Sequence, residues 1–460
     1  MTGPEAKAAE IAAAVRAKDV SALEVARAAI GRARADKWNA FTTVTAERAE
    51  AEAKAVDAKL ARGEDPGPLA GVPYAVKNLF DVQGITTISG SKIDRDLPPA
   101  RSDATAVTRL NSAGAVLIGA LNMDEYAFGF TTENTHYGAC RNPHDLSRIC
   151  GGSSGGSGAA PAAGMVPLTL GTDTNGSIRV PASLCSLFGL KPTYGRLGRG
   201  GAKLFAQSFD HIGPLARSAL DLALAYDAMQ GADPRDPACR NGPIEPVAAE
   251  LASGGDGLRV ALAGDYFTRQ LGPEAKEAVA MAAAALKAAH TVVLPEAGRA
   301  RAAAFIVTAA EGGNLHLQSL KTRAHDFDPH TRDRFLAGAL MPAAWSIQAQ
   351  RFRGWYRAKV LELFRDVDVI IAPATPVSAP PIGQETITLD GVELPTKPSM
   401  GIHTQPISFI GLPVCVAPIK RPGKLPIGVQ LIAAPWREID ALRAAAALES
   451  MGVAESKVAA

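Results

Sequence analysis

Cys150-Gly-Gly-Ser-Ser-Gly-Gly-Ser-Gly-Ala-Ala160 is a Ser- and Gly-rich island near the middle of the chain, and Gly171-Thr-Asp-Thr-Asn-Gly-Ser-Ile-Arg-Val-Pro181 follows it closely. A flexible linker could have the composition of this island. The sequence after it, however, is rich in alanine and then strongly apolar, as core segments are and linkers are not. The island lacks the Gly-Lys-Ser/Thr ending of a P-loop and the G-x-G-x-x-G pattern of a dinucleotide turn. It therefore favours neither kind of phosphate site.

The second stretch contains a candidate nucleophile, Ser177, directly after Gly176. Glycine permits unusual dihedral angles and close backbone approach, so successive N–H groups here could converge on an oxyanion. A serine nucleophile needs a base, and none of the eight histidines lies beside Ser153 or Ser177 in the sequence. Lys77 ends the short apolar run Val72-Pro-Tyr-Ala-Val-Lys77 and becomes a base only if burial lowers its pKa. The alternative is a lysine at a strand end that reaches solvent.

Alternating strand-like and helical patterns indicate an α/β protein with helices on both faces of a sheet. Helices are expected over residues 5–62, where Ser21-Ala-Leu-Glu24 has the spacing of a capping box, and over residues 273–289 and 437–450. Strands are expected at residues 72–76, 115–119, 166–170, 258–263, 291–294, 367–372, 412–417 and 428–433. The Gly- and Pro-rich residues 231–257 and 374–391 are predicted to be surface connections.

Composition excludes several classes of protein. The 48 basic and 46 acidic residues nearly cancel and form no dense basic block, so no nucleic-acid partner is expected. The five cysteines form no C-x-x-C pair, and neither a disulfide framework nor a metal site is predicted. The sequence has no signal-peptide pattern and no apolar run of membrane-spanning length. We expect a cytoplasmic protein without membrane contact, metal or cofactor.

The two central stretches, together with Gly189-Leu-Lys-Pro-Thr193, resemble the signature of the amidase signature family. The match covers residues 70–215 and resumes near the C-terminus. This resemblance implies a single domain over residues 1–460, with a mixed sheet in an α/β/α arrangement. It also implies a triad in which Ser177 is the nucleophile, Ser153 relays the proton and Lys77 is the neutral base. The peptide before Ser153 would be cis, and the oxyanion hole would be the N–H groups of Thr174, Asn175, Gly176 and Ser177.

Two branches of the family share further segments with this chain. Asn122-Met-Asp-Glu-Tyr-Ala-Phe-Gly129 is similar to the catalytic A subunits of glutamyl-tRNA amidotransferases, but the Asp that holds the glutamine amino group there corresponds to Gly401. The carboxylate-binding arginine corresponds to Arg334, which could equally be a surface residue of a helix. Nearly the full chain resembles carboxybiuret hydrolases of cyanuric acid (s-triazine) degradation. The resemblance implies a small carboxylate-bearing amide or urea as substrate.

The same resemblance predicts that Arg334, Tyr126 and Ser154 bind the substrate. It implies an oligomer and a small accessory subunit similar to the amidotransferase C subunit. A glutaminase subunit of a tRNA-dependent amidotransferase, another small-amide hydrolase such as an allophanate hydrolase, and a catalytically silent scaffold are the alternatives. The intact Lys77, Ser153 and Ser177 positions disfavour the scaffold.

Overall fold

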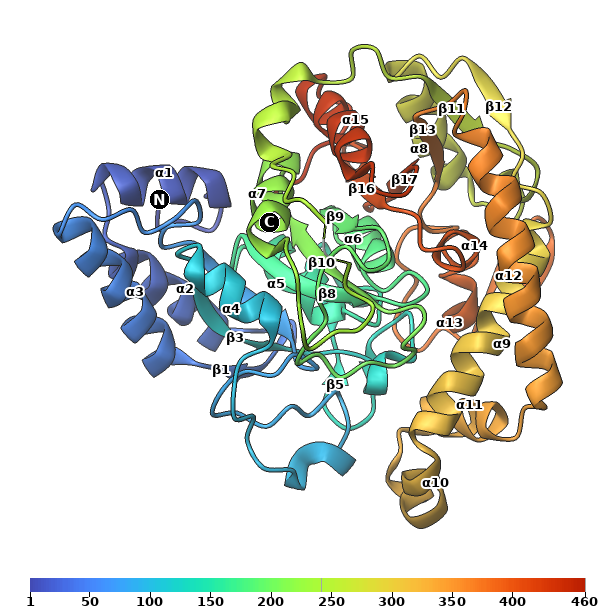
Figure 1. Cartoon of the computed structure of the whole chain (residues 1–460), viewed down its shortest axis with the longest axis horizontal. Coiled ribbons are helices and arrows are strands. Elements are labelled where there is room, and N and C mark those ends of the chain that lie inside the picture. Colours follow the sequence, from blue (N-terminus) through green and yellow to red (C-terminus); the bar gives the residue numbers. More distant parts are fainter. Residues whose placement is uncertain (241, 460) are drawn as a thin grey trace.

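The computed structural model describes residues 1–240 and 242–459, and its central feature is one mixed sheet of eleven strands (Figure 1). In order across the sheet the strands are β1 (Phe41–Val44), β3 (Val116–Leu121), β2 (Pro73–Lys77), β8 (Leu168–Asp173), β10 (His211–Ala216), β9 (Phe188–Lys191), β16 (Val414–Pro418), β17 (Gly428–Ala433), β13 (Val369–Pro373), β11 (Val260–Ala263) and β12 (His290–Val292). Three short two-stranded sheets lie outside it: β4 (Glu133–Asn134) with β5 (Gly138–Ala139), β6 (Arg141–Asn142) with β7 (Asp145–Ile149), and β14 (Thr386–Leu389) with β15 (Val392–Pro395).

Two neighbouring inner strands of the sheet, β2 and β8, position the predicted triad. Strand β2 pairs in parallel with β3 and with β8, and Val76 lies opposite Leu170. All residues of β2 and β8 are buried, as expected for strands covered by helices on both faces. Because parallel strands end at the same edge of a sheet, the polar residues that follow β8 lie beside Lys77 at the end of β2.

Helices cover the sheet and extend beyond one end of it. The longest, α9 and α12, run side by side far from α1–α3 (Figure 1). The α-helices are α1 (Ala8–Ala17), α2 (Ala22–Arg34), α3 (Ala46–Ala61), α4 (Thr105–Ser112), α5 (Gly155–Ala162), α6 (Arg179–Leu184), α7 (Ala219–Met229), α8 (Pro273–Ala285), α9 (Ala297–Leu315), α10 (Leu317–Arg323), α11 (Pro329–Ala339), α12 (Ala343–Leu363), α13 (Thr396–Ser399), α14 (Gln405–Ser408) and α15 (Glu438–Ser450). Short 3₁₀ turns are η1 (Ile93–Asp96), η2 (Glu125–Ala127), η3 (Ala248–Ser253), η4 (Asp265–Thr268) and η5 (Ala324–Asp326).

The N-terminal region is only partly as predicted. The capping box at the start of α2 is confirmed: Ser21 Oγ accepts from the Glu24 N–H at 3.1 Å, and the Glu24 carboxylate accepts from the Ser21 N–H at 3.0 Å. The prediction of a purely helical region over residues 5–62 is wrong, because Phe41–Val44 forms the edge strand β1, antiparallel to β3. This strand has few residues and is only half-buried, so its pattern is too short to detect.

The eight predicted strands occur within two or three residues of their expected bounds, and the sheet flanked by helices confirms the α/β class. Strands β9 and β10 were not predicted. Both are fully buried and contain glycine or proline, which obscures the pattern of a strand. Over the described ranges, no helix combines the length and apolar character needed to cross a bilayer.

Candidate active site

Lys77 lies at the end of β2 and is completely buried. Its Nζ donates hydrogen bonds to Ser153 Oγ at 2.7 Å and to Thr172 Oγ1 at 2.9 Å. Desolvation lowers the pKa of Lys77 to about 7, although the buried carboxylates of Asp124, Asp210 and Asp173 raise it in the opposite direction. Burial therefore dominates, and near neutral pH a large fraction of this amine is unprotonated.

The island forms a tight connection into α5. The Gly152–Ser153 peptide bond is cis. An added Cβ at Gly152 would lie 2.1 Å from Asp124 Oδ2, so a side chain there is excluded. The next residue, Ser154, donates from its hydroxyl to the Thr172 carbonyl at 3.2 Å. The island is thus a packed part of the core, joined to β8, and the linker interpretation is wrong.

Ser177 lies on the adjacent connection, between β8 and α6, and is 2% exposed. Gly176 before it has a φ of 141°, in a region that favours glycine, and an added Cβ would lie 2.3 Å from Thr404 Oγ1. That threonine hydroxyl donates to the Asn175 carbonyl at 2.6 Å. Within residues 1–240 and 242–459, the Ser177 hydroxyl has no hydrogen-bond partner, so the structure joins Lys77 to Ser153 but does not bond Ser153 to Ser177.

A buried ion pair holds the connection that carries Ser177. Asp173, at the end of β8, receives hydrogen bonds from Arg179 Nε and Nη2, both at 2.9 Å, and both side chains have zero exposure. Arg179 also donates to Gln430 Oε1 at 2.7 Å and to the Thr404 carbonyl at 3.0 Å. The guanidinium keeps the pKa of Asp173 well below its usual range. Sequence reasoning missed this pair, although the two residues flank Ser177 in the signature stretch.

The remaining residues of the predicted oxyanion hole are anchored through their side chains. Thr174 donates to Asp210, and Asn175 Nδ2 donates to Thr308 Oγ1 of α9 at 3.2 Å. Residues far away in the sequence therefore hold the backbone of this connection in place. The prediction that the N–H groups of Thr174, Asn175, Gly176 and Ser177 converge on one oxyanion remains a prediction.

Arg334 is on α11, stacked on a ring and not free on the surface. Its guanidinium lies 3.6 Å from the centre of the Phe128 ring, and Nη1 donates to the Phe128 carbonyl at 2.7 Å. Burial lowers the pKa of Arg334 to about 10, and the nearby charge of Asp124 opposes this shift. Among the residues that the structure describes, this half-buried guanidinium donates a single hydrogen bond, so it has donors left for an anion. Arg334 is thus a half-buried residue of α11 that packs on Phe128, and its contact with substrate remains a prediction.

Asp124 joins the triad region to the Arg334 region. Its N–H donates to the Ser153 carbonyl at 3.2 Å, and its carboxylate accepts from the Thr132 N–H at 3.0 Å. Desolvation raises the pKa of Asp124 to about 6. This buried carboxylate is a second titrating group beside Lys77, which sequence analysis did not identify.

The structure gives Tyr126 and Ser154 protein partners. The Tyr126 hydroxyl donates to Asp94 Oδ1 at 3.2 Å, and its ring contacts His316 and Phe335. Ser154 is bonded to β8 as described. Their predicted contacts with substrate remain predictions.

Gly401 faces the phenyl ring of Phe130. An added Cβ at position 401 would lie 2.4 Å from Phe130 Cζ, and the same ring lies 3.4 Å from an added Cβ at Gly176. Phe130 therefore lies between the nucleophile connection and residue 401. A carboxylate at position 401 has no room unless this ring moves.

A cavity of about 690 Å³ lies between α9 and the segments 203–208 and 237–238. Its lining includes Phe205, whose ring lies 4.6 Å from that of Phe128. Lys77, Ser153 and Ser177 do not line it. The cavity is thus separate from the triad, and the rings of Phe205 and Phe128 lie between it and Arg334.

Comparison with known proteins gives one consistent family. The Amidase family model matches residues 24–442. AtzE, which is one subunit of the 1-carboxybiuret hydrolase of Pseudomonas sp. (strain ADP), is 60% identical over 91% of this chain and 92% of that protein. The A subunit of the glutamyl-tRNA(Gln) amidotransferase of Roseiflexus sp. (strain RS-1) is 38% identical over 92% of each.

The similarity extends to three-dimensional structure. A solved chain from a vestigial protein complex that reveals the evolutionary origins of an s-triazine catabolic enzyme superposes with a TM-score of 0.97. It is 56% identical and covers 98% of this chain and 100% of its own length. A family model matched over most of the chain and a relative at 60% identity lead to one conclusion: this chain belongs to the amidase family.

Proposed function

We propose that this protein hydrolyses a C–N bond in a small carboxylate-bearing amide or urea, with 1-carboxybiuret of s-triazine degradation as the substrate. The observation that carries the chemistry is the contact between Lys77 Nζ and Ser153 Oγ at 2.7 Å, with the pKa of the lysine lowered to about 7. A base must be unprotonated at working pH, and burial supplies that condition without a histidine.

In the proposed reaction, Ser177 Oγ attacks the carbonyl carbon of the substrate. Its proton passes to Ser153, and Ser153 passes its own proton to the unprotonated Lys77. The N–H groups of residues 174–177 stabilise the oxyanion. Ammonia leaves with a proton returned along the same path, and water then cleaves the ester at Ser177. A rotation of the Ser177 hydroxyl toward Ser153 precedes the first step, because the two are not bonded in the structure.

Two features support an anionic substrate. Arg334 offers free guanidinium donors at the edge of the site, and charge-assisted pairs with carboxylates are strong and geometrically specific. Position 401, where the related amidotransferases carry the Asp for an amino group, is a glycine closed off by Phe130. We propose that Tyr126 and Ser154 complete the substrate site and that residues 1–460 act as one domain.

The proposed assembly contains a small accessory subunit similar to the amidotransferase C subunit, in a cytoplasmic oligomer without nucleic acid. Its support is that the similar AtzE and glutamyl-tRNA(Gln) amidotransferase proteins are both subunits. The alternative function is a glutaminase subunit of an amidotransferase, and its support is the 38% identity to a glutamyl-tRNA(Gln) amidotransferase A subunit.

Ammonia release separates the two functions. The protein, with and without a co-expressed small subunit, is supplied with 1-carboxybiuret or with glutamine, and Ser177→Ala provides the blank. We expect turnover of 1-carboxybiuret and none of glutamine. Turnover of glutamine alone would replace the proposal with the amidotransferase function.

A further inference from the structure

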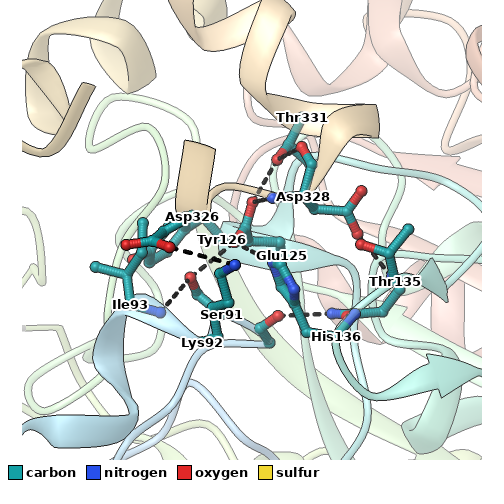
Figure 2. A network of polar contacts seen from close by, with 12 residues as sticks. Ser91, Lys92, Ile93, Glu125, Tyr126, Thr135, His136, Asp326, Asp328 and Thr331 are labelled. Carbon is teal, nitrogen blue, oxygen red and sulfur yellow. Dashed lines mark hydrogen bonds and ion pairs between the residues drawn. The ribbon is translucent and has the colours of Figure 1, made fainter. Parts of the chain in front are cut away.

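Glu125 is a fully buried carboxylate that the proposed reaction does not use. It lies in the turn after β3, and both of its oxygens are occupied (Figure 2). Oε1 accepts from Ser91 Oγ at 2.7 Å and from His136 Nε2 at 3.1 Å. Oε2 accepts from the Asp328 N–H at 2.8 Å and from the Thr331 hydroxyl. Four donors from three separate segments thus converge on one side chain.

Two of these donors belong to the start of α11. Asp328 is the N-cap of this helix, and its own carboxylate accepts from the His330 N–H and the Thr135 N–H, both at 2.8 Å. A second carboxylate at a helix N-terminus is favourable because it faces unpaired N–H groups. Glu125 therefore fastens the first turn of α11 to the segment that follows β3.

The same segment contacts α11 again one turn later. Arg334 donates to the Phe128 carbonyl, and Phe335 packs against the Phe128 ring with 4.9 Å between ring centres. Both ends of the segment 125–128 therefore contact this helix, one through Glu125 and the other through Phe128. On its other side, the N–H of Asp124 donates to the Ser153 carbonyl at 3.2 Å. A short, continuous set of contacts joins Ser153 to Arg334.

We propose that Glu125 is a positioning residue that holds α11, and with it Arg334, at a set distance from the Lys77–Ser153 pair. The inference rests on the proposed function, in which Arg334 binds the substrate carboxylate. Misplacement of a substrate anchor by about 1 Å can lower a rate on the order of a hundredfold. An anchor carried by a helix needs its first turn fixed, and Glu125 supplies that contact.

Three variants test the proposal: Glu125→Ala, Glu125→Gln and Asp326→Asn. Asp326 is a matched control, because it belongs to the neighbouring contacts in Figure 2 but pairs with Lys92 and Arg323 and not with α11. In Glu125→Ala, kcat/KM for an anionic substrate should fall on the order of tenfold or more, mainly through KM, with a much smaller loss for an uncharged amide. Asp326→Asn should change neither.

Glu125→Gln should rescue most of the loss. The glutamine has the same shape, its carbonyl can accept from the two α11 donors, and its amide can donate to the Ser91 hydroxyl. This variant also keeps the proposal testable if Glu125→Ala does not fold. If Glu125→Gln folds and is as impaired as Glu125→Ala, the positioning role is overturned, because charge and not placement would then be responsible.

Two further measurements connect the effect to Arg334. In an Arg334→Ala background, adding Glu125→Ala should cause no further selective loss for the anionic substrate. Amide hydrogen exchange over residues 329–339 should be faster in Glu125→Ala than in wild type and unchanged in Asp326→Asn. Equal losses for both substrates, or unchanged exchange in α11, would overturn the proposal. If Arg334→Ala lowers kcat/KM equally for the anionic and the uncharged substrate, the proposal of an anionic substrate is refuted. Hydrogen exchange in α11 then still decides whether Glu125 holds this helix.

Discussion

At the scale of single residues, the proposed chemistry depends on Ser177 and Lys77. Ser177→Ala and Lys77→Ala should each lower turnover by at least about a thousandfold, because one removes the acyl acceptor and the other removes the base. Ammonia release measures this loss. Ser112→Ala, at an exposed serine of α4, is the control and should keep full activity. Activity of either triad variant within about tenfold of wild type would contradict the assignment.

The pH dependence should report on Lys77 and its neighbour Asp124. Activity should rise through about pH 7, where Lys77 loses its proton. The charge of Asp124 raises the pKa of this lysine, so Asp124→Asn should shift the rising limb to lower pH. The exposed Asp19→Asn should leave it in place. The pKa of Asp124 itself is about 6, so this carboxylate could also cause the rise in activity. If the rise disappears in Asp124→Asn, the titrating group is Asp124 and not Lys77.

The same lysine makes the free energy of unfolding depend on pH. Folding lowers its pKa from 10.5 to about 7, so between these values the unfolded chain binds more protons and stability rises with pH. The destabilising contribution is complete below about pH 7 and absent above the unfolded pKa. The free energy of unfolding of Lys77→Met should therefore exceed that of wild type most at neutral pH, and this difference should shrink at alkaline pH. Urea unfolding at both pH values measures the difference, and a constant difference would refute the expectation.

At the scale of elements, the connection from β8 to α6 is shaped by contacts on both sides. Gly176→Ala would introduce a Cβ 2.3 Å from Thr404 Oγ1 at a φ of 141°, and should displace the N–H groups around Ser177. We expect kcat to fall on the order of a hundredfold, as for loss of an oxyanion donor. Gly31→Ala on α2, where an added Cβ contacts nothing within 4 Å, should keep normal activity. Equal kcat values for the two variants would exclude this role of the connection.

At the scale of the whole molecule, specificity requires α11 to meet the signature core. Arg334→Ala should lower kcat/KM for a carboxylate-bearing substrate on the order of a hundredfold, because a charge-assisted contact is lost. An uncharged amide should lose little. Arg332→Ala is the matched control, since Arg332 lies on the same helix and pairs with Asp333 at 2.8 Å. Equal losses for both substrates in Arg334→Ala would make this arginine structural.

Sequence alone determined the features that depend on local pattern. Alternating apolar runs placed β2, β8 and most other strands, because buried strands need apolar side chains. The signature stretches singled out Lys77, Ser153 and Ser177, since these residue types at these places resemble one family. The strand β1 and the strands β9 and β10 escaped detection, because they are short or contain glycine and proline.

Tertiary structure alone decided how the site is assembled. The 2.7 Å contact between Lys77 and Ser153 joins residues 76 positions apart, and complete burial of the lysine sets its pKa. The bond of Arg179 to Gln430, the stacking of Arg334 on Phe128 and the four donors around Glu125 all bring distant segments together. Such contacts leave no periodic trace in a sequence, because desolvation and hydrogen-bond geometry arise only when the chain is folded.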